Sequence, residues 1–343
     1  MSSQDPLQRA AAGPRSPRVV FFGSPPFAVP ILARLVASEF RPVAVVTPPD
    51  RAAGRGRKSQ PSPVAEIAAE AGVVLLRPER ARDGEFRRAL RALNADVFLV
   101  ASYGELFDSE LLEMPRRACL NVHGSLLPRW RGASPIQSAI LAGDSTTGVT
   151  IQRMVEALDA GDLLVARETP IGPTETSGDL FARLAELGGE AALEALASIA
   201  AGRESYTPQD PRGVTRCRKL TKSMGELDWS ESAVALERRV RAVTPWPGAR
   251  TVLPDGRTLG VLRASVAPAD PDAPNPEPGS IDASALGQGR LVVGTGDGSL
   301  ELQEVKPQGK RAMDTRAFLN GTPLTADDRL GSSGAAREAE GTE

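Results

Sequence analysis

A single histidine, His123, stands out among the 343 residues of this chain as a group that could do chemistry. It follows Asn121 by two positions within residues 118–137 (ACLNVHGSLLPRWRGASPIQ). If residues 118–122 form a strand, Asn121 and His123 point to the same face, because side chains alternate along a strand. An amide donor and an imidazole then meet at the carboxyl end of a strand, where open α/β sheets bind ligands. Such a pair can stabilise an oxyanion and move a proton near neutral pH.

The residues after His123 suit a binding loop. Gly124 allows a sharp turn and a close approach of a ligand to the backbone. Residues 125–128 (SLLP) supply backbone groups and an apolar surface, and Arg129 and Arg131 flank Trp130. That pairing suits an anionic or aromatic ligand. A lone histidine is more often an ordinary surface or core residue. The Asn, Gly and Pro residues close to His123 in the sequence favour a functional site instead.

Length and composition limit the alternatives. A chain of 343 residues with 41% hydrophobic residues is expected to fold into two domains. Residues 1–17 lack the apolar centre of a secretory signal and are expected to be a disordered extension, as is the tail at 331–343. The cysteines, Cys119 and Cys217, form no CxxC motif, so we expect a metal-free, cytoplasmic protein. The net charge of −2 does not indicate nucleic-acid binding, yet the basic residues are clustered.

Strand and helix patterns alternate through the first half of the chain. A buried strand at 19–23 precedes a helix at 27–37 and a strand at 43–47. The alternation continues with helices at 62–71, 84–93, 133–142 and 177–201 and with strands at 73–76, 96–101, 148–154 and 164–168. This order predicts an α/β, Rossmann-like domain. Its first turn, GSPPFA, is not GxGxxG and is weak support for a dinucleotide.

The second half has a different character. One helix is expected at 232–243, followed by short strands at 250–253, 259–265, 279–283, 290–294 and 300–306. Gly/Asp turns separate most of these strands, which predicts a small antiparallel, OB-like β-barrel. The proline-rich residues 267–278 are expected to be a disordered loop. Asp314 is expected to cap a final helix that ends at Leu319.

The stretch NVHGSLLPRWRGASPIQ resembles the active-site signature of the formyltetrahydrofolate-dependent formyltransferases, above all the members that act on methionyl-tRNA. The resemblance covers residues 19–330. It implies transfer of the formyl group of 10-formyltetrahydrofolate to the α-amino group of methionyl initiator tRNA, without a metal. It also implies that Asn121, His123 and Asp159 are catalytic. Asp159 lies 36 residues after His123, in LDAGD, which is similar to the family's LDTGD.

The same resemblance suggests binding residues. The folate is expected to lie against Ser125, Leu126, Leu127 and Pro128, with Tyr103 and Gly104 lining the pterin pocket. Residues 50–58, DRAAGRGRK, resemble a tRNA-contacting loop of the form DRPAGRGKK and differ from it at Ala52 and Arg57. Read without the family, this loop is expected to be solvated and mobile. The expected tRNA contacts are Arg55, Arg57, Lys58, Arg218, Lys219, Lys222, Lys306 and Lys310.

The expected organisation is a catalytic domain at 18–205, a basic linker at 206–222 and an OB-like tRNA-binding domain at 223–330, in a monomer. One alternative is a formyltransferase for a small amine, such as a nucleotide or an amino sugar, which has no use for the basic stretches. A nicotinamide-dependent oxidoreductase would have an acidic residue where Thr47 ends the second strand. A non-catalytic RNA-binding module would leave the signature around His123 unexplained.

Overall fold

The computed structural model describes residues 16–49, 51–53, 58–268 and 275–331, without the side chains of residues 51–53 and 58–60. The chain forms two compact units. The first consists of Met1–Gly132, Thr146–Pro170 and Phe181–Cys217, and the second of Ala133–Ser145, Ile171–Leu180 and Arg218–Glu343. No described helix is both long and apolar enough to cross a lipid bilayer.

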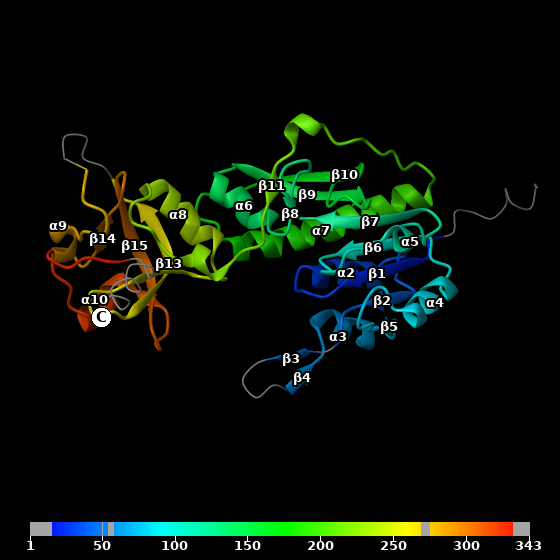
Figure 1. Ribbon diagram of the computed structural model, residues 1–343, viewed down its shortest axis with the longest axis horizontal. Coiled ribbons are helices and arrows are strands. Elements are labelled where there is room, and N and C mark those ends of the chain that lie inside the picture. The colour runs from blue at the N-terminus through cyan, green and yellow to red at the C-terminus, as the bar shows by residue number, and fades with distance from the viewer. Residues whose placement is uncertain (1–15, 50, 54–57, 269–274, 332–343) are drawn as a thin grey trace, which may run out of the picture. The chain divides into compact units, whose positions relative to one another are not determined.

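Seven of the described strands form the central sheet of the first unit (Figure 1). Its parallel strands are β1 (Val19–Gly23), β2 (Ala44–Val46), β5 (Val74–Leu76), β6 (Val97–Ala101) and β7 (Ala118–His123). The last two, β9 (Thr146–Arg153) and β10 (Leu163–Pro170), are antiparallel to their neighbours. The order is β10-β9-β7-β6-β1-β2-β5, so the chain switches direction of growth between β1 and β6. Ligands bind at such switch points in open α/β sheets.

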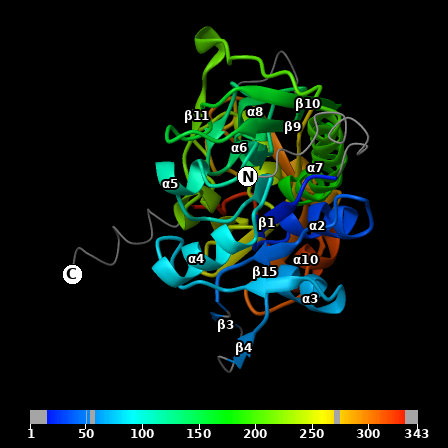
Figure 2. The ribbon, with the colours of Figure 1, turned by 90° about the vertical axis from the view of Figure 1, so that its right-hand side faces the viewer.

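Helices cover both faces of this sheet (Figure 2). On one side lie α2 (Ala28–Val36), α3 (Pro63–Glu70) and α7 (Ser177–Ala200), and on the other α4 (Gly84–Ala92) and α5 (Ser109–Leu112). Strands β1 and β6 are buried along their whole length, which explains their continuous apolar sequences. Ser62, Asp83 and Asp108 accept backbone N–H bonds at the starts of α3, α4 and α5.

The second unit is built on a curled antiparallel sheet. Its strands are β12 (Ala249–Val252), β13 (Thr258–Val266), β14 (Leu291–Gly294), β15 (Ser299–Pro307) and β16 (Met313–Asp314). The order is β12-β13-β15-β14, with β16 also paired to β15. Register shifts between β13 and β15 bend the ladder. The helices are α6 (Pro135–Ala142), α8 (Ala233–Ala242), α9 (Ala283–Gly287) and α10 (Thr315–Gly321).

The predicted fold class, a Rossmann-like α/β domain followed by an OB-like domain, is confirmed, and Asp314 caps α10 as expected. The strand predicted at 279–283 is wrong. Only isolated bridges occur at Ser280 and Ile281, and α9 begins at Ala283 because the Asp282 carboxylate accepts the Ala285 N–H. Within and just after the basic stretch at 50–58, β3 (Arg51–Ala53) pairs with β4 (Lys58–Gln60) in an antiparallel ladder.

Residues 206–217, expected to belong to a linker, lie in the first unit. Thr207 pairs with Leu163, and β11 (Arg216–Cys217) runs parallel to β8 (Arg131–Gly132). A short 3-10 helix, η1 (Pro211–Gly213), connects these two contacts. This segment therefore follows the surface around the end of β7, whereas the functional division of the chain into domains stays a prediction.

Candidate active site

Strand β7 places Asn121 and His123 on one face of the sheet. Cys119, on the same face by alternation, packs into the apolar cluster that contains Phe86 of α4 and Leu111 of α5. Val122 points the other way, because a Cβ added to Gly188 of α7 would lie 3.1 Å from its side chain. The predicted parity of Asn121 and His123 thus agrees with the packing around them.

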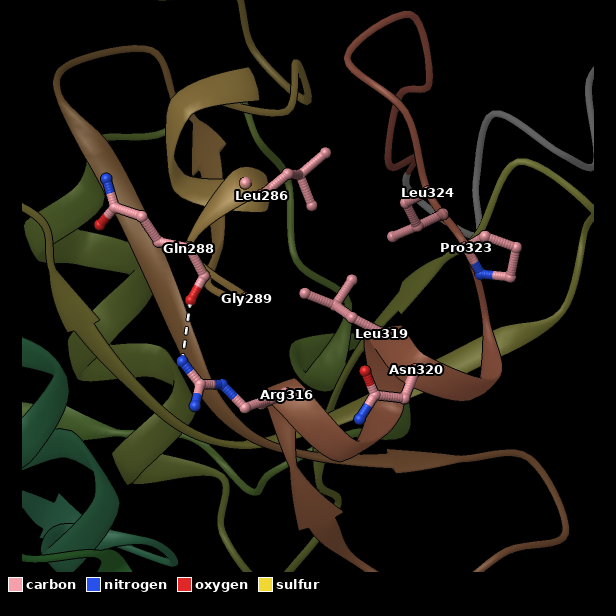
Figure 3. Close-up of a pocket in the computed structure, with 9 residues that line it drawn as sticks. Leu286, Gln288, Gly289, Arg316, Leu319, Asn320, Pro323 and Leu324 are labelled. Atoms are coloured by element: carbon pink, nitrogen blue, oxygen red, sulfur yellow. Dashed lines mark hydrogen bonds between the residues drawn. The ribbon is translucent and has the colours of Figure 1, made fainter.

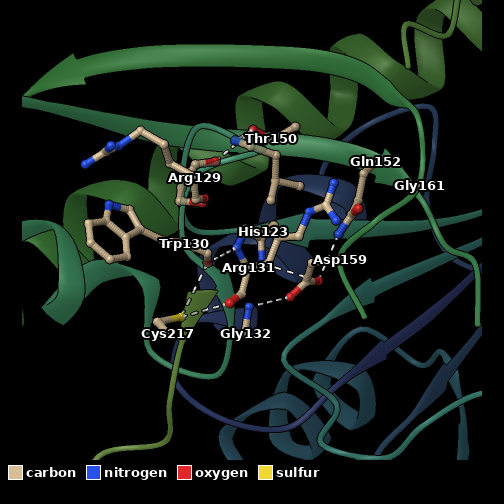
Figure 4. Close-up of polar contacts among 12 residues, drawn as sticks. His123, Arg129, Trp130, Arg131, Gly132, Thr150, Gln152, Asp159, Gly161 and Cys217 are labelled. Atoms are coloured by element: carbon tan, nitrogen blue, oxygen red, sulfur yellow. Dashed lines mark hydrogen bonds and ion pairs between the residues drawn. The ribbon is translucent and has the colours of Figure 1, made fainter. Parts of the chain in front are cut away.

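The imidazole of His123 is held between a carbonyl oxygen and a carboxylate (Figure 4). Its Nε2 lies 3.0 Å from the carbonyl oxygen of Trp130, which can only accept, so Nε2 carries hydrogen. Its Nδ1 faces Oδ1 of Asp159 at 3.6 Å, longer than a direct hydrogen bond. Both side chains are nearly buried, with exposed fractions of 6% for His123 and 8% for Asp159.

The carboxylate of Asp159 has a fixed orientation. Oδ2 accepts the Gly132 N–H at 2.8 Å, and Oδ1 accepts Nε2 of Gln152 at 2.9 Å. Gln152 pairs with Asn121 in the β7–β9 ladder. Its contact with Asp159 therefore places the Asp159 carboxylate at the end of β7 that carries Asn121 and His123. Asp159 itself has a φ of 52°, in the left-handed region that residues other than glycine seldom adopt.

The Asn121 amide is half-buried, and its side chain forms no hydrogen bond with any other described residue. Both N–H donors of this primary amide are therefore available to a ligand. The three predicted catalytic side chains therefore converge on one strand end, with a free donor, a histidine and an oriented carboxylate.

The loop after His123 uses its own polar atoms internally. Ser125 Oγ donates to the Arg129 carbonyl at 2.7 Å, and Thr150 Oγ1 donates to the Ser125 carbonyl at 2.7 Å. The Leu127 N–H donates to the same Thr150 oxygen at 3.1 Å. Ser125 and Leu127 are buried, whereas Leu126 and Pro128 are half-buried. What this loop offers a ligand is thus mainly apolar surface, and the hydroxyl of Ser125 is committed to holding the loop.

Tyr103 is more enclosed than its predicted place in a pterin pocket suggests. It is 4% exposed, and its ring packs edge-on to Phe22 and Phe107. Burial and then the nearby Glu105 carboxylate raise the pKa of its phenol, and its hydroxyl has no partner among the described residues. Gly104 is exposed at a φ of 86°. Both remain predicted binding residues, and Gly104 is the more accessible.

Arg129 and Arg131, which flank Trp130 in the sequence, have different partners in the structure. The Arg129 guanidinium lies 5.0 Å from the centroid of the Trp130 ring. Arg131 instead donates from Nε and Nη2 to Oε1 of Gln209, at 3.0 and 2.7 Å. The Arg131 guanidinium therefore joins two segments of the protein, residues 131 and 209, and is not directed at a ligand.

Sequence reasoning missed Gln152 and Gln209, which contact Asp159 from two sides. The only signal for Gln152 is its register opposite Asn121, which needs the antiparallel pairing of β9 to be known. No local pattern marks Gln209, because it lies 50 residues from Asp159 in a segment that resembles a linker.

The predicted tRNA contacts that can be located are at the surface. Arg55 and Arg57 lie outside the described residues, and so does the side chain of Lys58. The others are exposed, and within the described part of the chain none of them forms an ion pair: Arg218, Lys219, Lys222, Lys306 and Lys310.

A pocket in the second unit, between the end of α9 and α10, has a different chemistry (Figure 3). Its lining combines the apolar Leu286, Leu319 and Leu324 with the neutral amides of Gln288 and Asn320. Its single cation, Arg316, donates to the Gln288 carbonyl at 3.1 Å. With no acid–base pair in its lining, it is no rival to the site at β7. Among the described residues, no group of His, Cys, Asp and Glu is arranged to hold a metal ion.

Comparisons with known proteins match both the first and the second half of the chain. Residues 17–196 match the formyl transferase family, and residues 219–323 match the formyl transferase C-terminal domain. A methionyl-tRNA formyltransferase of Methylococcus capsulatus is 48% identical over 92% of this chain and 99% of that protein. One of Acidiphilium cryptum is 44% identical over 92% of this chain and all of that protein.

Solved structures share the fold at low sequence identity. An N-formyltransferase from Helicobacter canadensis, in complex with folinic acid and dTDP-3-aminofucose, has a TM-score of 0.64 at 15% identity. That match covers 83% of this chain and 98% of the other. HypX from Aquifex aeolicus, in complex with tetrahydrofolic acid, has a TM-score of 0.57 at 17% identity and covers 91% of this chain and 49% of its own. On the family match and the sequence identities together, this chain belongs to the formyl transferase family.

Proposed function

We propose that the protein transfers the formyl group of 10-formyltetrahydrofolate to the α-amino group of methionyl initiator tRNA, giving N-formylmethionyl-tRNA for translation initiation. The observation that carries the reaction is the convergence of Asn121, His123 and Asp159 at the end of β7. The observation that carries the substrate is the identity of 42–48% to methionyl-tRNA formyltransferases over nearly the whole chain.

The reaction needs a donor for negative charge. When the α-amine attacks the formyl carbon, a C–N bond forms, and the formyl oxygen becomes negative in a tetrahedral intermediate. Asn121 is suited to this oxygen, because its amide hydrogens have no protein acceptor among the described residues. One such donor is typically worth about 3 to 4 kcal/mol of the barrier.

The reaction also needs a proton to move. The attacking amine must lose a proton, and the folate nitrogen must gain one as its bond to the formyl carbon breaks. His123 Nε2 is committed to the Trp130 carbonyl, so Nδ1, which faces Asp159, is the ring nitrogen open to exchange. At 3.6 Å, Nδ1 and Oδ1 are too far apart for a direct hydrogen bond and too close for a water to lie in line between them. We assign the Asp159 carboxylate to stabilising the imidazolium that forms when His123 takes up a proton, and a water held beside Asp159 to carrying that proton.

The residues around the trio fit a folate. The folate supplies the formyl group already bonded to nitrogen, so the protein needs no nucleophile of its own. The half-buried Leu126 and Pro128 offer an apolar surface, and Gly104 leaves backbone accessible. We assign the folate to this surface, together with Ser125, Leu127 and Tyr103 as the residues that shape it.

The acceptor is large and anionic. We propose that the exposed basic residues of the second unit contact tRNA phosphates, together with Arg55, Arg57 and Lys58. We further propose that the protein acts as a monomer in the cytoplasm, with a catalytic domain at 18–205, a basic linker at 206–222 and a tRNA-binding domain at 223–330.

The test is to incubate the full chain with 10-formyltetrahydrofolate and methionyl-tRNA and to follow the mass of the aminoacyl product. We expect one formyl group to be added to the methionyl-tRNA and none to free methionine under the same conditions. A nucleotide-linked amino sugar is the second acceptor. Efficient formylation of that sugar without formylation of methionyl-tRNA would replace the proposed substrate with a small amine.

A further inference from the structure

The segment after α7 returns to the active site and inserts the side chain of Gln209. Its Oε1 accepts two hydrogen bonds from the Arg131 guanidinium, at 3.0 and 2.7 Å. Its Nε2 donates to the carbonyl oxygen of Asp159 at 2.9 Å and to that of Gly161 at 2.7 Å. Figure 4 labels these three partners, Arg131, Asp159 and Gly161. One carboxamide thus joins the chain at residue 131 to the loop that carries Asp159.

The orientation of this amide is dictated by its neighbours. A guanidinium can only donate, and a carbonyl oxygen can only accept. The oxygen of Gln209 must therefore face Arg131, and its nitrogen must face Asp159 and Gly161. Both amide hydrogens are then in use, so the contact with Gln152 Oε1 at 3.5 Å adds little. Arg131 therefore fixes the orientation of the Gln209 amide, so that its N–H groups donate to the Asp159 loop.

The Asp159 loop needs such support. Asp159 has a φ of 52°, a left-handed conformation that residues other than glycine keep only where the surroundings hold them in it. Gly161 packs closely against the backbone of Arg153, because a Cβ there would lie 1.7 Å from the Arg153 carbonyl oxygen. The Asp159 side chain is fixed by Gly132 and Gln152, but among the described residues only Gln209 contacts its backbone carbonyl.

We propose that Gln209 is a positioning residue for formyl transfer, acting through Asp159. It holds the Asp159 backbone in its left-handed conformation and so keeps the carboxylate opposite Nδ1 of His123. The inference rests on the proposed function, because it assumes that the carboxylate takes part in proton movement. Gln209 forms no hydrogen bond with Asn121 or His123, so its effect has to pass through the loop.

The nearly isosteric variant Gln209→Glu removes the N–H donor and adds a negative charge beside the Arg131 guanidinium. Its carboxylate still accepts from Arg131, so this contact survives, but it has no hydrogen for the two carbonyls. We expect kcat to fall about 10- to 100-fold, the loss typical of a misplacement near 1 Å. KM for methionyl-tRNA and for the folate should stay within about twofold, because neither substrate is assigned to Gln209. Gln303→Glu, the same change at an exposed position of the second unit, should keep the wild-type kcat.

A double variant separates positioning from a general structural role. If Gln209 works through Asp159, Gln209→Glu should reduce kcat by less than about threefold once Asp159→Ala is present. Losses that multiply in the double variant would overturn the proposal. Arg131 gives a second route if Gln209→Glu does not fold. Arg131→Met should lower kcat, and Arg131→Lys, which can still donate to Oε1, should recover part of it.

His123 provides a readout that does not depend on activity. Because it is the only histidine, an untagged protein labelled with ¹⁵N-histidine gives one set of ring signals. At a fixed pH, Gln209→Glu should move these signals in the same direction as Asp159→Asn, and Gln303→Glu should leave them in place. Wild-type ring signals in Gln209→Glu would overturn the proposal. If the wild type transferred no formyl group at all, the proposed function would fail, and the ring signals would still test the link from Gln209 to Asp159.

Discussion

Buried polar side chains of the first unit hold the residues of the candidate site, whereas those of the second unit join strands and turns that lie outside any such site. In the first unit, Thr150 holds the loop at Ser125, and Gln152 holds Asp159. In the second, Thr251 accepts from the Trp229 indole, and Thr295 donates to the carbonyl oxygens of Asp297 and Gly298 and so closes the turn at residues 295–298. The first pattern holds reactive groups in place, and the second stabilises a frame.

This difference separates the consequences of substitution. Buried polar groups cost free energy unless every partner is in place, so the first unit is expected to lose turnover when one contact is removed. The second unit has an apolar core and carries its charge on the surface. Changes to that charge should alter substrate affinity and its dependence on salt, with turnover preserved.

The largest effect is expected for His123→Ala. The variant loses the only imidazole in the chain, and general acid–base groups contribute about 10²- to 10⁴-fold. We expect kcat to fall within that range while KM for methionyl-tRNA stays near the wild-type value, as measured by initial rates of formylation. A variant that formylated at a rate near that of the wild type would exclude His123 from proton movement.

Asn121→Asp is expected to follow. The substitution preserves shape but replaces two donors with an acceptor, so the developing oxyanion faces negative charge. Loss of one oxyanion donor typically costs about 10²- to 10³-fold in kcat. Asn320→Asp, at an exposed position of the second unit, is the matched control and should keep its turnover. If Asn121→Asp changed only KM, the amide would be binding substrate and not the transition state.

Much of this could be predicted from sequence because the signals are local. The parity of Asn121 and His123 follows from a single strand, and the cap at Asp314 follows from one turn of helix. The role of Asp159 needed family resemblance, since an acidic residue in a loop is ordinarily just solvated. The sequence does not predict α9, because Ile281 and Ala283 alternate with polar residues as in a strand, whereas the Asp282 cap acts only once the helix after it forms.

The part that could not be predicted depends on pairing across long separations. Gln152 is recognisable only once β9 is known to run antiparallel to β7, which puts it opposite Asn121. Gln209 is 78 residues from Arg131 and 50 from Asp159, so no periodicity connects them. Composition predicts a basic linker at 206–222. The residue of this segment that contacts Asp159 is nevertheless the neutral Gln209.

A smaller effect is expected for Thr150→Val, which is nearly isosteric but lacks the hydroxyl. The Leu127 N–H and the Ser125 carbonyl would both lose their partner. Leaving buried groups unsatisfied costs about 1 to 3 kcal/mol, so Tm should fall and folate binding should weaken. Thr150→Ser keeps the hydroxyl and should recover most of both. Folate affinity unchanged in Thr150→Val would count against placing the folate on this loop.

In the second unit, Lys219→Ala and Lys222→Ala should raise KM for methionyl-tRNA and leave kcat unchanged. Each lost phosphate contact should also reduce the slope of log affinity against log salt by about 1. Arg257→Ala is the matched control, because Arg257 is exposed but already paired with Asp255. Equal salt slopes for all three variants would mean that Lys219 and Lys222 do not contact the tRNA backbone.

The smallest effect concerns the frame itself. Arg290 donates two hydrogen bonds to Glu301 across β14 and β15, at 2.8 and 2.6 Å, and lowers the pKa of that carboxyl from its ordinary value of 4.5. A lowered pKa in the folded state means that the ionised form is favoured by folding. The stabilisation is therefore complete above the pKa of the unfolded chain and is lost as the pH falls through the lower folded value.

Glu301→Gln should consequently cost less than about 1 kcal/mol at neutral pH, as expected for a pair at the surface. Denaturant unfolding at several pH values should show the difference from the wild type shrinking as the solution becomes acidic. Glu304→Gln, on the same strand and without an ion pair in the described part of the chain, should show no such dependence. Turnover should be unaffected in both, because neither carboxylate belongs to the network around His123. A fall in kcat with Glu301→Gln would mean that the frame is coupled to the chemistry more closely than the contrast between the two units implies.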